Sequence, residues 1–290
     1  MTWALHRWIW QLDGPLYVGA PPAGSLNRAR LYVPARALWG AVTAELARLE
    51  GTDQPKYDAV GSEVHEQTRF TYLYPAEHSE KGWYAWLPEY REGDGRVWLP
   101  IAGVRRPAAA QTERRFRSRL LSTRPGTAMD PSNDAADVGS LRETECIQTR
   151  WRQNDGSVGS AVAMVGFVFT RDETIKRRLD RVEVLFLGGD SRYGLGRMRR
   201  IAFDGAEQIF GLSVERGTQD PQVRTQRVLA HAEATTMRGD LECLVGWDYQ
   251  KPGKVQKVAD PLWMPGSEGT SDAVWSLLPD GTWKLAERPA

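Results

Sequence analysis

The 290-residue sequence predicts an α+β fold, with a ferredoxin-like (RRM-like) core that carries a long insertion and a C-terminal extension. Two segments have apolar residues at helical spacing, and each lies between segments with the pattern of buried strands. The resulting order of strand, helix, two strands, insertion, further strands, helix and strand is typical of a split β-α-β arrangement. A polar stretch interrupts that order, and a further β-rich stretch follows it.

Residues 4–12 are expected to form the first strand, because bulky residues occupy both of its alternating faces. A loop rich in Gly and Pro follows over 13–30. Pro34 is expected to open the first helix, where its missing N–H costs nothing. Apolar residues at helical spacing between Leu38 and Leu49 continue this helix, and Gly51 is expected to end it.

Two short strands are expected next, over 68–75 and 82–101, separated by turn signals. Residues 103–143 contain few large apolar side chains and divide into a basic half and an acidic, small-residue half. We expect them to leave the core as a long insertion, because loops of such length are usually functional or disordered. Strands resume at 144–151 and 161–170.

The second helix has the clearest local signal. Residues 170–173 fit a capping box, in which the Thr170 hydroxyl and the Glu173 carboxylate accept hydrogen bonds from free backbone N–H groups. Apolar residues at helical spacing mark one face of the helix (Ile175, Leu179, Val182 and Phe186). Gly188 and Gly189 predict its end, and residues 197–203 predict a closing strand. We expect a core over 1–204 that contains the insertion at about 103–143. Residues 205–290 are expected to form a C-terminal extension, a second small β-rich subdomain with strands around 241–249 and 274–285.

The composition excludes few functions. A formal charge of +1 and a pI near 7.8 give no global signal for a polyanion ligand, so a nucleic-acid site must rest on local clusters. The basic residues are 31 Arg and 7 Lys, which suits RNA or reflects a GC-rich genome. Cys146 and Cys243 stand far apart, so neither a zinc site nor a disulfide framework is expected. The chain has neither the pattern of a signal peptide nor an apolar stretch of the roughly 18–20 residues that span a bilayer, and we expect a cytoplasmic protein without a membrane partner.

The segment 188–197 is the most specific motif, because four glycines stand among polar and basic residues. Glycines allow a backbone to turn sharply and to approach a ligand closely, and successive N–H groups form anion-binding nests. The segment is not a P-loop, because Leu195 and Gly196 stand where Lys and Ser/Thr belong, and it is not a dinucleotide fingerprint either. The candidate RNA-binding residues are Gly188, Gly189, Ser191, Arg192, Tyr193, Gly194, Gly196 and Arg197; the alternative is a tight structural connection.

Two further clusters point in the same direction. The first turn of the first helix carries Arg36, with Trp39 after it, and a helix N-terminus favours a phosphate. Residues 105–124 contain one acid, Glu113, and seven arginines, which would release counterions from an RNA backbone: Arg105, Arg106, Arg114, Arg115, Arg117, Arg119 and Arg124. The alternatives are an ordinary amphipathic helix for the first cluster and a solvated loop for the second.

Together these motifs resemble the RAMP (repeat-associated mysterious protein) superfamily of CRISPR subunits. The segment 32–41 is similar to that family's Pro-containing opening of the first helix, residues 122–145 resemble its thumb hairpin, and 188–197 resembles its glycine-rich loop. The resemblance covers about 1–204, and implies a ferredoxin-like fold in which loop and thumb contact guide RNA. The partners that it implies are guide RNA (crRNA), with target RNA left open, and the other subunits of a type III ribonucleoprotein complex of antiviral defence.

The same resemblance argues against catalysis. Family members that cut RNA use an Asp in the loop after the first strand, whereas residues 14–44 contain neither Asp nor Glu, and Asp13 is expected to be a turn residue. His6, His65, His78 and His231 show no pairing in the sequence that suggests acid–base work. We expect no catalytic residues, no metal and no cofactor. Within such a complex, two roles are open: an end subunit that caps the 5′ handle of the guide, which the missing Asp and the C-terminal extension favour, and a backbone subunit that lacks the cleaving Asp. An RNA-cleaving enzyme of the same superfamily and a protein-interaction module remain the alternatives.

Overall fold

The computed structural model describes residues 2–51, 53–101, 110–153, 155–234, 236–248, 255–258 and 260–286. The protein is a mixed α/β molecule in which most strand pairs are antiparallel. Its two large sheets have nine and eight strands, and smaller sheets and hairpins are attached to them. Among the residues that the structure describes, no helix is both long enough and apolar enough to cross a membrane.

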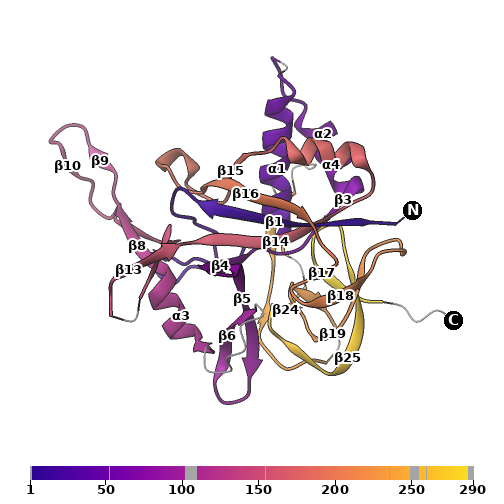
Figure 1. The fold of residues 1–290 in the computed structure, drawn as a ribbon. Coiled ribbons are helices and arrows are strands. Elements are labelled where there is room, and N and C mark those ends of the chain that lie inside the picture. Colours follow the sequence, from indigo (N-terminus) through magenta and orange to yellow (C-terminus); the bar gives the residue numbers. More distant parts are fainter. Residues whose placement is uncertain are drawn as a thin grey trace.

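Four strands form the centre of the nine-stranded sheet. Their order is β16-β1-β14-β3, and every neighbouring pair is antiparallel: β1 (Ala4–Leu12), β3 (Thr68–Phe70), β14 (Ala163–Thr170) and β16 (Arg197–Gly205). The expected first strand is confirmed with its bounds, and Trp8 and Trp10 on it are fully buried. Helices α1 (Ala35–Leu49), α2 (Tyr57–Gln67) and α4 (Glu173–Asp180) gather on one side of these strands (Figure 1).

The sheet continues beyond β14 through four more strands: β4 (Tyr74–Ser79), β5 (Gly82–Arg91), β6 (Gly95–Ile101) and β7 (Gln111–Thr112). At the other edge, β15 (Val184–Phe186) pairs with β16. Helix α2 was not expected from the sequence. It packs closely on α1 at Gly61, where a Cβ would come within 3.2 Å of the Trp39 ring and crowd it.

The expected insertion is only partly an excursion, and its first half belongs to the core. Residues 102–109 lie outside the described residues, but 113–120 form helix α3, in which Phe116 and Leu120 are fully buried. The chain then forms a three-stranded sheet of β8 (Leu121–Gly126), β11 (Arg142–Ile147) and β2 (Leu26–Asn27), ordered β2-β11-β8. Beyond it, β9 (Met129–Asp130) and β10 (Ala135–Ala136) form a hairpin that projects from the body (Figure 1). We call residues 122–143 the arm.

The second helix is shorter than expected and is capped by another residue. Asp172 is the N-cap, and its carboxylate accepts from the backbone N–H groups of Thr174 and Ile175 at 2.8 and 3.0 Å. The Thr170 hydroxyl instead lies 3.3 Å from His6 Nε2, because Thr170 is still part of β14. The helix ends at Asp180, and Phe186 lies on β15, so Gly188 and Gly189 follow a strand and not a helix. The strand expected at 197–203 is confirmed as β16.

The C-terminal part forms the eight-stranded sheet, ordered β17-β18-β19-β25-β26-β20-β24-β21. Its strands are β17 (Gln208–Ile209), β18 (Leu212–Glu215), β19 (Gln222–Arg227), β20 (Ala232–Glu233), β21 (Leu241–Glu242), β24 (Leu262–Trp263), β25 (Glu268–Leu277) and β26 (Trp283–Leu285). Separate hairpins are formed by β22 (Val245–Asp248) with β23 (Val255–Val258), and by β12 (Arg150–Arg152) with β13 (Val158–Ala161).

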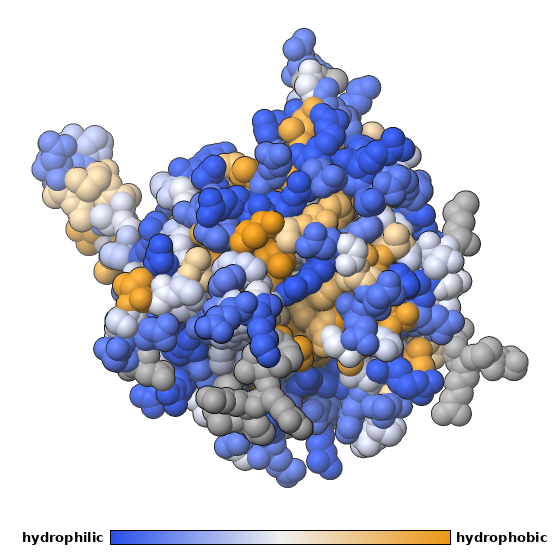
Figure 2. Space-filling view, viewed as in Figure 1, coloured by the Kyte–Doolittle hydropathy of each residue, from blue (hydrophilic) through white to orange (hydrophobic). Residues whose placement is uncertain are grey.

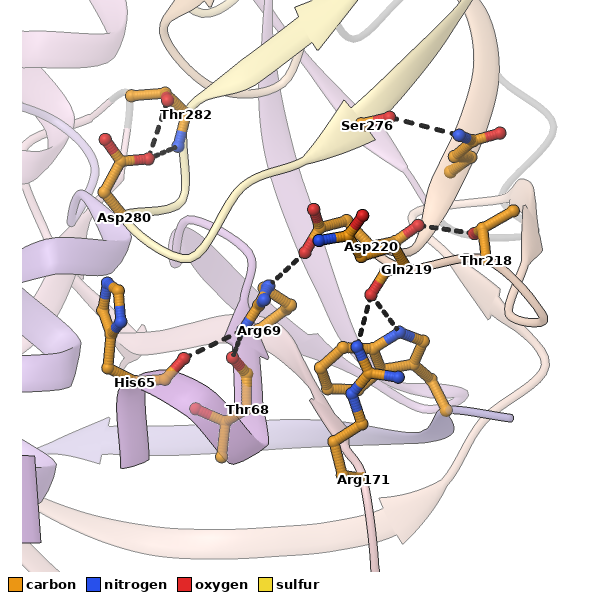
Figure 3. A network of polar contacts seen from close by, with 12 residues as sticks. His65, Thr68, Arg69, Arg171, Thr218, Gln219, Asp220, Ser276, Asp280 and Thr282 are labelled. Carbon is orange, nitrogen blue, oxygen red and sulfur yellow. Dashed lines mark hydrogen bonds and ion pairs between the residues drawn. The ribbon is translucent and has the colours of Figure 1, made fainter. Parts of the chain in front are cut away.

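This sheet shares one hydrophobic core with the rest of the chain, because buried residues of both parts, including Trp275 and Trp283, form a single cluster. A polar network also joins them (Figure 3). Arg69 Nε contacts Asp220 at 2.7 Å, and the Gln219 carbonyl accepts from the indole N–H of Trp3 and from Arg171. The division of the chain at 204 into core and extension stays a prediction.

Candidate RNA interface

The glycine-rich segment follows β15 as a loop around a single 3₁₀ turn at Ser191–Tyr193. Two of its glycines are required by close packing: a Cβ on Gly188 would lie 2.1 Å from the Tyr17 carbonyl oxygen, and one on Gly196 would lie 1.9 Å from that of Leu187. Several loop N–H groups serve the protein itself, since Gly189 donates to Tyr17 O at 2.9 Å and Gly196 donates to Pro15 O at 2.8 Å. These glycines therefore hold the loop against the segment after β1, and the N–H groups of Gly189 and Gly196 already have partners within the protein.

The loop and the arm face one another across a cleft of about 470 Å³. The loop contributes Asp190, Tyr193 and Leu195 to its lining. The arm and the start of β11 contribute the other side, with Arg124 to Ala128, Ser140, Arg142 and Thr144. The structure thus brings together two of the three motifs that the sequence singled out, although they are about fifty residues apart in the chain.

One contact joins the two sides of the cleft. The Arg142 guanidinium lies over the Tyr193 ring, 5.3 Å from its centroid, in a cation–π arrangement. The Tyr193 side chain is nevertheless 68% exposed, so much of its surface is open. An arginine and an exposed aromatic ring at one place offer a charge for phosphate and a surface for a nucleobase.

The base of the arm is held in shape by its own polar groups. The Ser140 hydroxyl lies 2.7 Å from the Thr127 hydroxyl, and the Ala128 N–H donates to it at 3.0 Å. In the β8–β11 ladder, Arg124 stands opposite Thr144, and both line the cleft. The Arg124 side chain is exposed, and within the described ranges it has no ion-pair or hydrogen-bond partner. Its charge is available to a ligand.

The cleft also contains one acid. Asp190 is half-buried with a left-handed backbone conformation (φ 56°), and within the part of the chain described its carboxylate has no hydrogen bond or ion pair. A carboxylate repels phosphate, so this side of the cleft suits a hydrogen-bond donor such as a ribose hydroxyl or a base amino group. The sequence reasoning did not select Asp190.

Two arginines at the start of β16 lie beside the cleft and do not line it. Arg197 and Arg199 contact Asp13 at 3.0 and 3.4 Å, and their side chains are about half exposed. Arg192 is exposed and next to Tyr193. Asp13, expected as a turn residue, therefore holds basic residues of β16 close to the loop.

The arginines of the expected basic run divide into different classes. Arg119 is buried, pairs with Glu77 at 3.1 Å and lies over the rings of Trp86 and Trp151, so its assignment to RNA binding is corrected. Arg117 is also occupied, with Glu145 at 2.5 Å. Both pairs join positions far apart in sequence, which the local pattern could not reveal. Arg114 and Arg115 are exposed on α3 but do not line the cleft, so the cleft does not support their assignment to RNA binding. Arg105 and Arg106 lie outside the described residues.

The first-helix cluster does not reach the cleft. Arg36 is exposed on the first turn of α1, whereas Trp39 packs toward α2 and donates from its indole N–H to Gly61 O at 3.1 Å. The N-terminus of α1 is covered by the C-terminal part, because a Cβ on Gly281 would lie 2.1 Å from the Ala35 Cβ. A phosphate at this helix end is therefore not supported by the packing, and Trp39 is a packing residue.

The histidines include one pairing that the sequence did not show. His231 Nε2 lies 2.9 Å from Glu242, and its Nδ1 lies 2.8 Å from the Tyr72 hydroxyl. The sequence shows no motif for this pair, because its two residues come from separate segments of the C-terminal part. His231 is fully buried, and burial lowers its pKa although Glu242 raises it. His6 is buried, and among the described residues no cluster of His, Cys, Asp and Glu has the arrangement of a metal site.

No protein-family model and no curated protein matches this sequence. Among solved structures, the chain is similar to one in the type III-B Cmr-beta complex bound to cognate target RNA, with 10% identity, a TM-score of 0.43 and coverage of 69% of this chain and 98% of that one. A chain from the apo state of Cmr-beta gives 10% identity, a TM-score of 0.41 and coverage of 68% and 96%. A third, from Cmr-beta bound to cognate target RNA and AMPPnP, gives 9% identity, a TM-score of 0.48 and coverage of 90% and 84%.

Proposed function

We propose that this chain is a non-catalytic, guide-RNA-binding subunit of a type III CRISPR effector complex, of the RAMP superfamily that its motifs resemble. The observation that supports this is the cleft in which the glycine-rich loop and the arm meet, joined by Arg142 and Tyr193. The similar chains in solved structures come from a type III-B complex described as bound to cognate target RNA, the class of assembly proposed here. Guide RNA and neighbouring effector subunits are the proposed partners, with target RNA as a second ligand.

The central sheet supports a ferredoxin-like core. The order β16-β1-β14-β3 is antiparallel throughout, α1 connects β1 to β3, and α4 lies between β14 and β16. In this arrangement the glycine-rich loop leads into the last core strand, and the arm inserts between the second and third. Both therefore emerge where a strand of RNA can pass over the end of the sheet.

We infer that the RNA backbone lies along Arg124 and Arg142 and continues past Arg192 and Arg197, with a base stacked on Tyr193. The arm acts as the thumb. It stands clear of the body in the space-filling view (Figure 2), and three large apolar side chains on it are exposed: Met129, Val138 and Leu141. An exposed apolar group on a projecting hairpin is suited to wedge between stacked bases.

We propose a subunit without catalysis because the segment after β1 lacks a carboxylate that could serve in cleavage. Residues 14–44 contain no acid, and Asp13 contacts Arg197 and Arg199. A ribonuclease remains the alternative function. Incubation of labelled guide RNA and target RNA with the wild-type chain, and with Asp13→Ala, His6→Ala and His65→Ala, separates the two: cleavage that one of these variants abolishes would establish the enzyme.

The binding test is filter retention of a single-stranded guide RNA over a salt series. Arg192→Ala/Arg197→Ala should bind more weakly and with a shallower salt dependence than the wild type, because each lost phosphate contact lowers the slope by about 0.7 for a single strand. Arg114→Ala/Arg115→Ala is the matched control, since both residues are exposed on α3 outside the cleft. Equal losses in both double variants would contradict the proposed path, and copurification with protein alone would favour an interaction module.

A further inference from the structure

A second pocket lies where three parts of the chain meet, and we call it the junction pocket. It has a volume of about 290 Å³. Its lining comes from the loop before α1, from β6 and α3 of the core, and from residues 240–242 and 264 of the C-terminal part. Side chains from segments far apart in sequence thus converge on one small space.

This pocket is separate from the cleft. Successive side chains of a strand point to opposite faces, and β11 separates the two sites in this way. Thr144 lines the cleft, whereas the side chain of the next residue, Glu145, contacts Arg117, which lines the junction pocket. A strand of RNA in the cleft does not fill the junction pocket, and its occupant has to be identified from its own chemistry.

The floor of the junction pocket is a preorganised charged group. Arg30 pairs with Glu242 at 2.6 Å, and their side chains are only 12% and 8% exposed. Behind them, His231 contacts Glu242 at 2.9 Å and Tyr72 contacts His231 at 2.8 Å, so the carboxylate is fixed in place. Tyr32 also lines the pocket, and its buried hydroxyl has no hydrogen-bond partner among the described residues. Fixed polar groups at the bottom of a small pocket orient a ligand at little entropic cost.

The rim carries one unpaired cation. Arg96 pairs with Asp240 at 2.7 Å and Arg117 with Glu145 at 2.5 Å, so both are satisfied. Arg28 is exposed, and its guanidinium has no ion-pair or hydrogen-bond partner within the described part of the chain. The pocket thus presents one free positive charge at its mouth, which favours a ligand with a single anionic group.

The walls between floor and rim are apolar. Pro21, Leu31, Trp98, Leu241 and Met264 line this part of the pocket. The Leu241 side chain is 54% exposed, so an apolar or flat group that enters the pocket would cover it. A pocket of this size holds one ring system with its substituents, since drug-sized sites begin near 300 Å³.

We propose that the junction pocket binds one nucleotide, with the base against Leu241 and Met264, its polar edge toward Glu242, and the phosphate on Arg28. A nucleotide combines the three features that the pocket requires: a flat ring, donor groups for a fixed carboxylate, and one anionic end. The same chemistry comes either from a free mononucleotide or from an unpaired nucleotide of an RNA strand. This site does not rest on the proposed function, since it lies on the other face of β11.

Binding of the four nucleoside 5′-monophosphates to the full chain is measured by isothermal titration calorimetry. Arg28→Ala and Leu241→Glu should each weaken the best-bound monophosphate about tenfold or more, because the first removes a charge-assisted hydrogen bond to the phosphate and the second replaces the apolar surface under the base with a carboxylate. Both positions are exposed, so neither variant should disturb folding, and circular dichroism checks this. Arg224→Ala, an exposed arginine on β19 outside both sites, is the matched control.

The source of the nucleotide is decided with a single-stranded RNA that carries 2-aminopurine. A change in its fluorescence that Arg28→Ala abolishes, and that a monophosphate competes away, identifies an RNA nucleotide as the occupant. Monophosphate binding without this change identifies a free nucleotide. Arg124→Ala/Arg142→Ala should leave monophosphate binding unchanged, so failure of the cleft and failure of this site are distinguishable. If neither monophosphates nor the RNA base respond to Arg28→Ala and Leu241→Glu, the site is not a nucleotide pocket.

Discussion

Helix α3 and the base of the arm are both rich in arginine, yet they use it in opposite ways. In α3, Arg117 and Arg119 lie against Glu145 and Glu77, and Arg119 is buried among tryptophans. At the base of the arm, Arg124 and Arg142 line an open cleft, and the Arg142 guanidinium lies over the exposed ring of Tyr193. A run of arginines therefore does not locate a nucleic-acid site by itself. The placement of carboxylates from distant segments decides which charges remain available to a ligand.

The largest expected effect is a loss of folding stability in Arg119→Ala. The substitution leaves Glu77, whose side chain is 12% exposed, without its cation, and breaking a buried pair costs about 3–5 kcal/mol. Urea denaturation should show a corresponding loss of unfolding free energy, whereas Arg114→Ala on the exposed face of the same helix should change it by less than about 0.5 kcal/mol. If Arg119→Ala left stability intact and lowered RNA affinity, Arg119 of α3 would bind RNA, as the arginines of the arm are proposed to do, and would not stabilise the core.

For Arg124→Ala/Arg142→Ala we expect a loss of RNA affinity without a loss of folding stability. Stability should stay within about 0.5 kcal/mol of the wild type, because within the described residues neither guanidinium has an ion-pair partner. Guide-RNA affinity at moderate salt should fall about thirtyfold, and the salt slope should decrease by about 1.4. Filter retention measures both quantities, and an unchanged slope would show that these arginines do not contact phosphate.

Tyr193→Ala separates stacking from charge within the cleft. Loss of a base-stacking surface should cost about 1–3 kcal/mol of binding free energy, while the salt slope should stay that of the wild type because no cation is removed. Tyr193→Phe should retain the affinity. A Tyr193→Phe variant as weak as Tyr193→Ala would assign the role to the hydroxyl and not to the ring.

The smallest expected effect is a modest gain of RNA affinity in Asp190→Asn. Removal of a negative charge beside bound phosphates should raise RNA affinity about threefold at low salt, and the gain should diminish as salt screens the charge. If the carboxylate accepts from a ribose hydroxyl, the variant should also discriminate less between RNA and DNA of the same sequence. Unchanged RNA affinity together with unchanged RNA–DNA discrimination would remove Asp190 from the site.

The sequence patterns predicted the elements whose signal is local. Strand β14 is a nearly continuous apolar run, β1 has bulky residues on both faces, and α1 has a clear periodicity between a proline and a glycine, so each was found close to its observed bounds. Helix α3 was missed because only Phe116 and Leu120 mark its buried face among five charged residues. A buried arginine looks like a solvated one in the sequence, and its burial is decided by partners that the fold supplies.

In the candidate site too, the sequence identified the segments but not which of their residues face the cleft. The glycine-rich loop and the arm were both singled out, and the structure places them across one cleft. Within them the roles differ from expectation: Gly188 and Gly196 serve packing, whereas Arg142, present in the thumb-like motif, and Asp190 were not selected as ligands. The spacing of residues in a sequence motif shows which segments are candidates for binding a ligand. The direction of each side chain in the folded β ladder decides which of their residues face that ligand.

The central claim is that RNA lies in the cleft between loop and arm. It is tested most directly by photo-crosslinking the wild-type chain to a guide RNA that carries 4-thiouridine, followed by mass spectrometry of the crosslinked peptides. We expect crosslinks within 188–197 and 122–143, with Tyr193 among the modified residues, and none on the exposed face of α3 that carries Arg114 and Arg115. Crosslinks concentrated on α3, with the cleft peptides unmodified, would contradict it.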